Sequence, residues 1–310
     1  MNIIGLQYLT FGVEDLAAAH RYLLDYGLDV SEYDPEVGGT YIALDSTGVI
    51  VRRSDHSGLP PLPPGACSPC LRETHYGVAD DATLVQLYRL LGADREVSVD
   101  ADGTLHCLDD SGFGIAFQRA RRQPIHAPRL GFNVPGQTPG RAPNDCGADP
   151  SAVIKPRSLS HVVYFVEDAA KAEAFYRRLG FVVTDRLNQL GPFMRPAGTH
   201  DHHTLFMLHS HNEHMVGCNH FTFHFGSAGE VLQQGWRFQQ KGYQSFWGPG
   251  RHLMGSNFFW YFNSPFGAVM EFDADMDHHD DSWVPRALEP GADNSQIFLF
   301  EGVDKWAPGE

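Results

Sequence analysis

Two stretches, LQYLTFGVEDLAAAHRYLLDYGL (residues 6–28) and LSHVVYFVEDAAKAEAFYRRLGF (residues 159–181), are copies of one pattern. Their Val-Glu-Asp triplets superpose at an offset of 153 residues, and so do Gly27 and Gly180. Each copy reads as a β-rich run, an aspartate such as Asp168 that can cap a helix, an amphipathic helix and a glycine stop. Because this pattern recurs, the chain contains an internal repeat.

A second match near the end of each half shows how far the repeat extends. DDSGFGIAFQ (residues 109–118) aligns with FNSPFGAVMEF (residues 262–272), and the offset between their Phe-Gly pairs is again 153 residues. Each half also contains a second strand and helix between these two motifs, at residues 74–91 in the first half and 219–240 in the second. The sequence therefore predicts an α+β fold of two homologous domains, each built from two modules of strand, helix and three strands (βαβββ).

The domain boundaries follow from composition and from the repeat. Residues 1–120 form the predicted N-terminal domain, and residues 158–281 form the predicted C-terminal catalytic domain. Between them, residues 121–157 are rich in Pro, Gly, Arg and Asn without periodicity, which is typical of a linker. Residues 282–310 form a C-terminal tail that either covers a pocket or mediates assembly.

Composition excludes several classes of protein. The 310 residues carry 23 Lys and Arg against 38 Asp and Glu, a formal charge of −15. A nucleic-acid or anionic-membrane binder needs a basic surface, so neither partner is expected. No apolar run reaches the roughly 20 residues of a membrane-spanning helix. Five cysteines at irregular spacing make no disulfide framework, so we predict a cytoplasmic protein.

Histidine is the unusual component. The chain has 17 histidines, and eight of them lie between residues 200 and 224. His161 and His220 open equivalent strands of the third and fourth modules, whereas Glu271 lies in an apolar strand, where an unpaired carboxylate is costly. Two histidines and one carboxylate from three strands match the facial triad of non-haem Fe(II) oxygenases. We therefore predict a metal site formed by these three residues.

The first half offers an internal comparison. At the same offset, Tyr8 stands where His161 does and Gln118 where Glu271 does, and His75 corresponds to His220 at an offset of 145. This half keeps one of three ligand types, so the N-terminal domain is predicted to hold no metal.

The chain resembles the type I extradiol ring-cleavage dioxygenases of the vicinal oxygen chelate superfamily, with 2,3-dihydroxybiphenyl 1,2-dioxygenases as the nearest group. The resemblance rests on residues 250–271, GRHLMGSNFFWYFNSPFGAVME, and on the shorter motifs at 201–206 and 219–221. The family signature is a His, a Tyr about nine residues on, Pro-x-Gly and a Glu. In this chain those positions are His252, Tyr261, Pro265, Gly267 and Glu271.

The resemblance implies a role for each candidate residue. His161, His220 and Glu271 would bind Fe(II), and Mn(II) accepts the same ligand set. His203 would be the acid–base residue beside O₂, and its neighbour His202 is expected to point the opposite way if both lie in a strand. Tyr261 would hydrogen-bond the deprotonated catechol oxygen. His252 would hydrogen-bond the substrate or ring-cleavage intermediates.

The implied reaction is Fe(II)-dependent extradiol (meta) cleavage of a catechol by O₂, giving a hydroxymuconic semialdehyde-type product in aromatic degradation. The sequence also resembles the branch that acts on ring-carboxylated catechols such as 2,3-dihydroxy-p-cumate. A substrate carboxylate would need a cation, and the candidates are Arg186, Arg195, Lys241 and Arg251. One departure from the family stands at Gly255, where many relatives have an acidic residue.

Two alternatives stay open at this point. One is a metal-dependent isomerase or lyase of the glyoxalase type, which would lack the group of His203, His252 and Tyr261. The other is a metal-free small-molecule binding protein, which would leave Glu271 buried without a partner. The relatives are commonly homo-oligomers, so a homo-oligomer is expected, with a catecholic small molecule and O₂ as its other partners.

Overall fold

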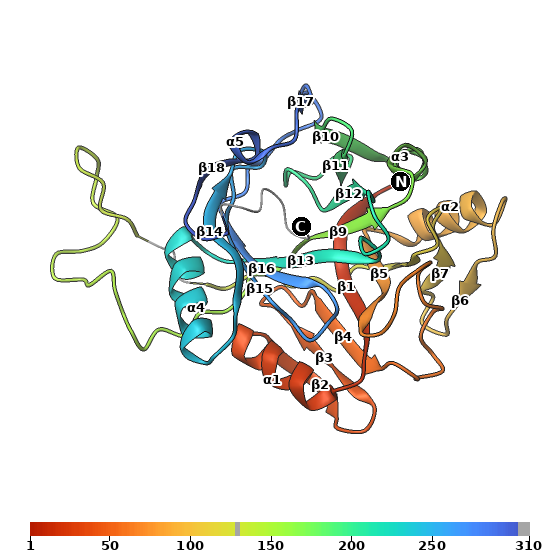
Figure 1. Cartoon of the computed structure of the whole chain (residues 1–310), viewed down its shortest axis with the longest axis horizontal. Helices are drawn as coiled ribbons and strands as arrows, with labels where there is room; N and C mark the ends of the chain where they lie inside the picture. Colours follow the sequence, from red (N-terminus) through yellow and green to blue (C-terminus); the bar gives the residue numbers. More distant parts are fainter. Residues whose placement is uncertain (128–130, 303–310) are drawn as a thin grey trace.

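The computed structural model describes residues 1–127 and 131–302, and in Figure 1 these form two halves, each built around one sheet. Each half contains two modules of strand, helix and three strands. The first module consists of β1 (Ile3–Val13), α1 (Leu16–Tyr26), β2 (Asp29–Asp34), β3 (Gly38–Ile42) and β4 (Gly48–Arg53). The second consists of β5 (Cys70–Val78), α2 (Asp81–Leu91), β6 (Ser98–Val99), β7 (Leu105–Leu108) and β8 (Gly114–Arg119).

The second half repeats this order. Its first module consists of β9 (Ser158–Val166), α3 (Ala169–Arg178), β10 (Phe181–Leu187), β11 (Gly191–Pro196) and β12 (Leu205–His209). Its second consists of β13 (Cys218–His224), α4 (Ala228–Gln240), β14 (Ser245–His252), β15 (Phe258–Phe262) and β16 (Val269–Ala274). The predicted fold class, with two modules in each half, is confirmed.

The helix signals in the repeat act as predicted. The carboxylate of Asp168 accepts hydrogen bonds from the backbone N–H groups of Ala170 and Lys171, which satisfies donors that a helix start leaves unpaired. Gly27 and Gly180 follow their helices with φ of 113° and 90°, a backbone conformation that favours glycine. These signals fix where α1 and α3 begin and end.

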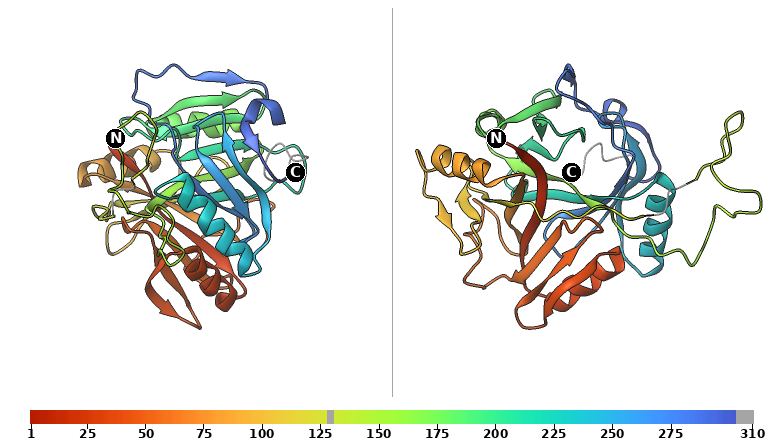
Figure 2. Two further views of the ribbon diagram at one scale, coloured as in Figure 1. Left: turned by 90° about the vertical axis from the view of Figure 1, so that its left-hand side faces the viewer. Right: turned by 180° about the vertical axis from the view of Figure 1, so that it is seen from behind.

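The sheets have the same internal pattern. In each module the first and last strands pair in parallel, and the two modules of a half meet through antiparallel first strands, β1 with β5 and β9 with β13. The strand orders are β2-β3-β4-β1-β5-β8-β7-β6 and β17-β10-β11-β12-β9-β13-β16-β15-β14-β18, where the two edge strands are β17 (Arg286–Leu288) and β18 (Gln296–Leu299). Figure 2 shows the two sheets packed against each other, with α1 and α4 on the same side.

The connecting segments differ in structure. Within the predicted linker, the described residues 121–127 and 131–157 contain neither helix nor strand. Figure 1 shows a loop of this segment extending away from the body beyond α4, whereas the end of the segment packs back on the body, with Ile154 buried in the core. The predicted tail instead adds β17 (Arg286–Leu288) and β18 (Gln296–Leu299) to the second sheet, with the short helix α5 (Ala292–Ser295) between them in the chain. There β17 pairs with β10 and β18 with β14. Residues 303–310 lie outside the described part of the tail.

Over the described ranges, every helix is too short or too polar to cross a membrane.

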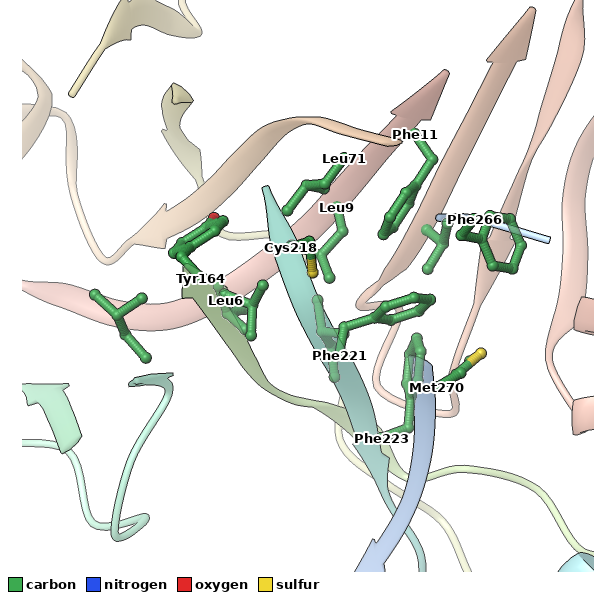
Figure 3. Close-up of a cluster of buried hydrophobic side chains, with 14 of the residues drawn as sticks. Leu6, Leu9, Phe11, Leu71, Tyr164, Cys218, Phe221, Phe223, Phe266 and Met270 are labelled. Atoms are coloured by element: carbon green, nitrogen blue, oxygen red, sulfur yellow. The ribbon is translucent and has the colours of Figure 1, made fainter. Parts of the chain in front are cut away.

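A shared core joins the two halves (Figure 3). Leu6, Leu9 and Phe11 of the first sheet lie against Phe221 and Met270 of the second. The rings of Phe11 and Phe221 are 4.8 Å apart between centroids. Burying several such side chains contributes about 1.5–3 kcal/mol each, so the N-terminal half supports the C-terminal sheet.

Alternation along β13 and β16 separates this core from the opposite face. Phe221 and Phe223 of β13 are fully buried in the shared core. His220 directly precedes Phe221 and therefore faces the opposite side of the sheet. On β16, Phe272 joins the core and Glu271 points to the opposite face. The hydroxyl of Tyr26, from the N-terminal half, donates a hydrogen bond to the backbone carbonyl of Glu271. The first half therefore fixes the strand that carries this carboxylate.

The N-terminal half has a buried ionic cluster of its own. The carboxylate of Glu73 lies 2.9 Å from Nδ1 of His106 and 3.1 Å from Nε2 of His75. Burial alone would raise the pKa of Glu73, but hydrogen bonds from His106 and His75 outweigh burial and lower this pKa to about 2.

Glu73→Gln is expected to lower the free energy of unfolding at pH 7 by about 3 kcal/mol, because the folded state holds the carboxylate in its ionised form. A depressed carboxyl pKa stabilises the fold above the unfolded pKa, and this contribution is lost as pH falls toward 2. The difference between variant and wild type should therefore shrink by about 1 kcal/mol at pH 3.5. Urea unfolding of the variant and of wild type at pH 7 and at pH 3.5 measures this difference. A difference that does not change with pH would contradict the low pKa assigned to Glu73.

Candidate metal centre

Three buried side chains meet on the inner face of the second sheet. His161 lies on β9, His220 on β13 and Glu271 on β16, which are adjacent strands. Their potential ligand atoms all lie within 4.8 Å of one another. Nε2 of His161 is 3.2 Å and Nε2 of His220 is 3.7 Å from Oε2 of Glu271. This arrangement presents two imidazole nitrogens and one carboxylate to a single point.

The carboxylate of Glu271 fits a bound cation. Its side chain is fully buried, and no described residue gives either oxygen a hydrogen bond of ordinary geometry. Burial, together with the charge of Asp273, raises the pKa of Glu271. A buried carboxylate without a partner is costly, whereas a divalent cation would satisfy both oxygens. The donor set of two imidazoles and one carboxylate suits Fe(II) or Mn(II).

The outer nitrogen of each histidine is held in place. Nδ1–H of His161 donates to Oγ of Ser160 at 3.0 Å, and this hydroxyl donates to Asp273 at 3.0 Å. Nδ1–H of His220 donates to the amide oxygen of Asn219. These bonds leave each Nε2 unprotonated, with its lone pair directed at the site, which is the arrangement that metal-ligating histidines usually have. Burial lowers the pKa of His161 to about 4, and it also lowers that of His220, so both rings are neutral ligands.

The three other predicted site residues line a cavity beside this point. The ring of His203 is 4.2 Å from that of His161 between centroids, and the ring of Tyr261 is 5.0 Å from that of His220. Nε2 of His252 lies 3.2 Å from the hydroxyl of Tyr261. The structure therefore brings all six predicted residues together. Their individual roles stay predictions.

Burial controls the protonation of these groups. It lowers the pKa of His203 well below its ordinary value, and neighbouring histidines, above all His161, act in the same direction. It raises the pKa of Tyr261, and the adjacent charge of Glu271 adds to the effect. Before any ligand binds, His203 is thus a neutral acceptor and Tyr261 a neutral hydroxyl.

The rest of the cavity wall is mainly apolar. Its apolar side chains come from β9 to β12, from β14 and from the loop after β14, and are Val163, Leu187, Phe193, Phe206, Leu208, Trp247 and Met254. Asn257 also lines the cavity, is fully buried, and has no hydrogen bond to its amide group from any described residue. Ser295 and Gln296 line it as well, so the C-terminal tail contributes to the cavity.

The four cations proposed from sequence as carboxylate partners lie elsewhere. Arg186 pairs with Glu173 at 2.7 Å and Arg195 with Asp281 at 2.9 Å. Lys241 pairs with Asp25 of the N-terminal half.

Arg251 pairs with Asp275 at 3.0 Å. Among the described residues, none of these four lines the cavity.

Sequence reasoning missed the residues that stand behind the site. Ser160, Asp273 and Asn219 could have been suspected only as neighbours of the predicted ligands.

His202 was expected to point away from His203 if both lay in a strand. Both residues instead precede β12 in a loop, and their Nδ1 atoms are 2.9 Å apart.

The equivalent positions of the N-terminal half are also adjacent. Nδ1 of His75 lies 3.3 Å from the side-chain oxygen of Gln118, and the rings of Tyr8 and His75 are 6.3 Å apart between centroids. The strand register agrees, because Gln118 lies opposite Gly77 just as Glu271 lies opposite Thr222, in each case two residues beyond the histidine. The repeat arithmetic thus located equivalent places in the two sheets.

Comparisons with known proteins agree with this fold. Residues 158–272 match the model of the Glyoxalase/Bleomycin resistance protein/Dioxygenase superfamily. The chain is 28% identical over 287 residues to metapyrocatechase 2 of Cupriavidus necator, covering 88% of this chain and 82% of that protein.

Two solved structures show the same fold. One is the Mn(II)-bound glyoxalase from Novosphingobium aromaticivorans, with a TM-score of 0.76 and 20% identity over 97% of this chain and 93% of that one. The other is homoprotocatechuate 2,3-dioxygenase from Arthrobacter globiformis, with a TM-score of 0.72 and 17% identity over 100% and 91%. The comparisons therefore confirm the resemblance of this chain to the type I extradiol dioxygenases, and its residues 158–272 match the Glyoxalase/Bleomycin resistance protein/Dioxygenase superfamily.

Proposed function

We propose that the protein is an extradiol dioxygenase that uses Fe(II) and O₂ to open a catechol ring beside its two hydroxyl groups. The observation that carries the proposal is the buried Glu271 beside His161 and His220, whose carboxylate receives no ordinary hydrogen bond from the described residues. The relationship to metapyrocatechase 2 supports it. Both atoms of O₂ would enter the product, a hydroxymuconic semialdehyde. The proposed metal is Fe(II), and Mn(II) suits the same ligands.

When bound, the metal would supply open coordination positions for the catechol oxygens and O₂. The protein's own groups would handle the protons. Tyr261 can hydrogen-bond a catechol oxygen, and His252, 3.2 Å from its hydroxyl, orients that group. His203 is neutral and can accept a proton in the buried cavity, then return it during ring cleavage.

A glyoxalase-like isomerase is the second candidate, because a structure of that name shares the fold. The presence of His203, His252 and Tyr261 around the metal site favours the dioxygenase. Metal-free protein would be loaded with Fe(II) without oxygen and then given catechol and O₂. Uptake of one O₂ per catechol with formation of a yellow product supports the proposal. Metal binding without O₂ uptake across a panel of catechols, or isomerisation of a thiohemiacetal, would overturn it.

The cavity favours a neutral ring substituent. Seven apolar side chains, among them the stacked pair Phe193 and Phe206 with ring centroids 3.8 Å apart, line this space, and no described Arg or Lys does. A substrate carboxylate buried there would lose its hydration without gaining a partner. We therefore propose alkyl- or aryl-substituted catechols as substrates, in place of the carboxylated catechols suggested by sequence.

For 3-methylcatechol, kcat/KM is expected to be at least about 10-fold higher than for 2,3-dihydroxybenzoate, which carries a carboxylate at the same ring position. Initial rates of O₂ consumption with the Fe(II)-loaded protein measure both. A preference for the carboxylated compound would show that a cation reaches the cavity.

A cytoplasmic homo-oligomer remains part of the proposal. The cytoplasmic location rests on the five cysteines, all of which are free thiols. The homo-oligomer rests on the assembly that is common among the relatives. Light scattering tests the assembly.

A further inference from the structure

A row of buried polar groups stands behind His203. Nδ1 of His203 lies 2.9 Å from Nδ1 of His202, and Nε2 of His202 lies 2.9 Å from Oδ2 of Asp185 on β10. His202 and Asp185 are fully buried, and His203 is nearly so. The row therefore connects the cavity wall to a carboxylate that does not itself touch the cavity.

The carboxylate at the end of this row is firmly held. The guanidinium of Arg286 donates to both oxygens of Asp185, with Nε at 3.0 Å from Oδ2, and the backbone N–H of Arg286 donates to Oδ1 at 2.8 Å. These bonds come from β17, the strand that the tail adds to the sheet edge. With several donors around it, Asp185 is ionised and can only accept hydrogen bonds.

The direction of each bond in the row follows from this. An ionised Asp185 requires that Nε2 of His202 carries the proton. A neutral imidazole has a single N–H, so Nδ1 of His202 is then an acceptor. His203 must therefore donate from Nδ1. Its other nitrogen, Nε2, is left with a lone pair on the ring that lines the cavity.

The fold makes space for this row at Gly255. A Cβ atom at that position would lie 3.1 Å from Nδ1 of His202, and φ is +82°, so a side chain there would be both crowded and strained. The ring of His202 stands against this glycine, and the carboxylate that it meets is Asp185 of β10.

We infer that Asp185, acting through His202, fixes the tautomer and orientation of His203 so that Nε2 is presented as a proton acceptor. Asp185 and His202 are positioning residues and do not touch the reacting atoms. The catalytic meaning of this inference rests on the proposed function, whereas the tautomers do not depend on it.

The tautomers can be read directly in metal-free protein labelled with ¹⁵N-histidine, using two-bond ¹H–¹⁵N correlation spectra at neutral pH. Wild type should show His202 protonated on Nε2 and His203 protonated on Nδ1. The opposite pair of tautomers would overturn the inference. This measurement needs no variant, so it decides the matter even if substitutions at Asp185 unfold the protein.

Asp185→Asn tests the cause. The fixed backbone N–H of Arg286 would keep the amide oxygen at the Oδ1 position, and the part-exposed guanidinium can turn away. The amide N–H₂ would then take the Oδ2 position, face His202 and invert both tautomers. The matched control is Asp277→Asn, because that carboxylate also lies near His202 but its side chain accepts from Ser256 instead. The control should leave both tautomers unchanged. Unchanged tautomers in Asp185→Asn would overturn the inference.

The catalytic consequence has a separate readout. Asp185→Asn should lower kcat about 10- to 100-fold while KM for the catechol and the metal content stay within about 2-fold of wild type, in the range seen for partners that orient ligands. An unchanged kcat with inverted tautomers would show that His203 is not the proton acceptor. If wild type consumes no O₂, the proposed function fails while the tautomer result stands.

Discussion

Glu271→Gln is expected to abolish O₂ consumption and to weaken binding of the divalent metal by more than about 100-fold. The substitution keeps the shape of the side chain but removes the one anionic ligand. Loss of partners outside the ligand shell already costs 10- to 100-fold in metal affinity, and loss of a charged ligand should exceed that. Equilibrium dialysis with Fe(II) or Mn(II) measures the affinity without depending on activity.

The same variant should not unfold. In the metal-free protein Glu271 is a fully buried carboxylate without a hydrogen bond from the described residues, and Gln removes the cost of burying its charge. We expect the free energy of unfolding of the metal-free variant at pH 8 to equal that of wild type or to exceed it by about 1–3 kcal/mol.

Glu73→Gln is the matched control, because it changes a buried carboxylate of the other half in the same way. It should lower stability and leave the metal affinity unchanged. If Glu271→Gln binds metal as tightly as wild type, the assignment of this residue as a ligand is wrong. A large loss of stability in that variant would instead indicate that Glu271 is held by partners within the protein.

His203→Ala is expected to lower kcat by about 10²- to 10⁴-fold, the range typical of a general acid–base residue, while metal content and catechol affinity are retained. The expectation follows from its position. The ring lies 4.2 Å from that of His161 and lines the cavity, but it is not one of the three grouped ligands. Single-turnover measurements on the Fe(II)-loaded variant separate substrate binding from ring cleavage.

The exposed His211 provides the control for this prediction. His211→Ala removes a histidine from the same histidine-rich region and should leave kcat, KM and metal content at wild-type values. If His203→Ala loses its metal, the residue supports the ligand set and is no proton acceptor. If it keeps full turnover, the cavity histidine has no part in the reaction.

The repeat made the fold predictable. Two Val-Glu-Asp triplets and two Phe-Gly pairs at one offset divided the chain in half, and the capping and stop signals at Asp168 and Gly180 lie where the helix requires them. Such signals are local, because a helix end is determined by residues within a few positions of it. The strand pattern pointed to the three candidate ligands and the family resemblance to the three other site residues, and the fold brings those six together.

The partners behind the site were not predictable in this way. Asp185 and His202 are 17 residues apart, and Arg286 is 101 residues from Asp185. Their contact depends on β17 joining the edge of the sheet, which no periodicity in the sequence indicated. Likewise, the cations that could have met a substrate carboxylate are paired outside the cavity, which only their positions in the fold reveal.

The sequence alone thus determined the two-domain repeat, the module order and the residue types of the candidate metal site, because repeats, caps and motif spacing are written along the chain. The tertiary structure decided that Glu271 lacks an ordinary hydrogen bond from the described residues, that the cavity wall is mainly apolar, and that His203 is backed by His202 and Asp185. These features depend on which side chains come into contact across strands. Burial and hydrogen bonding result from contacts between residues that are far apart in the sequence.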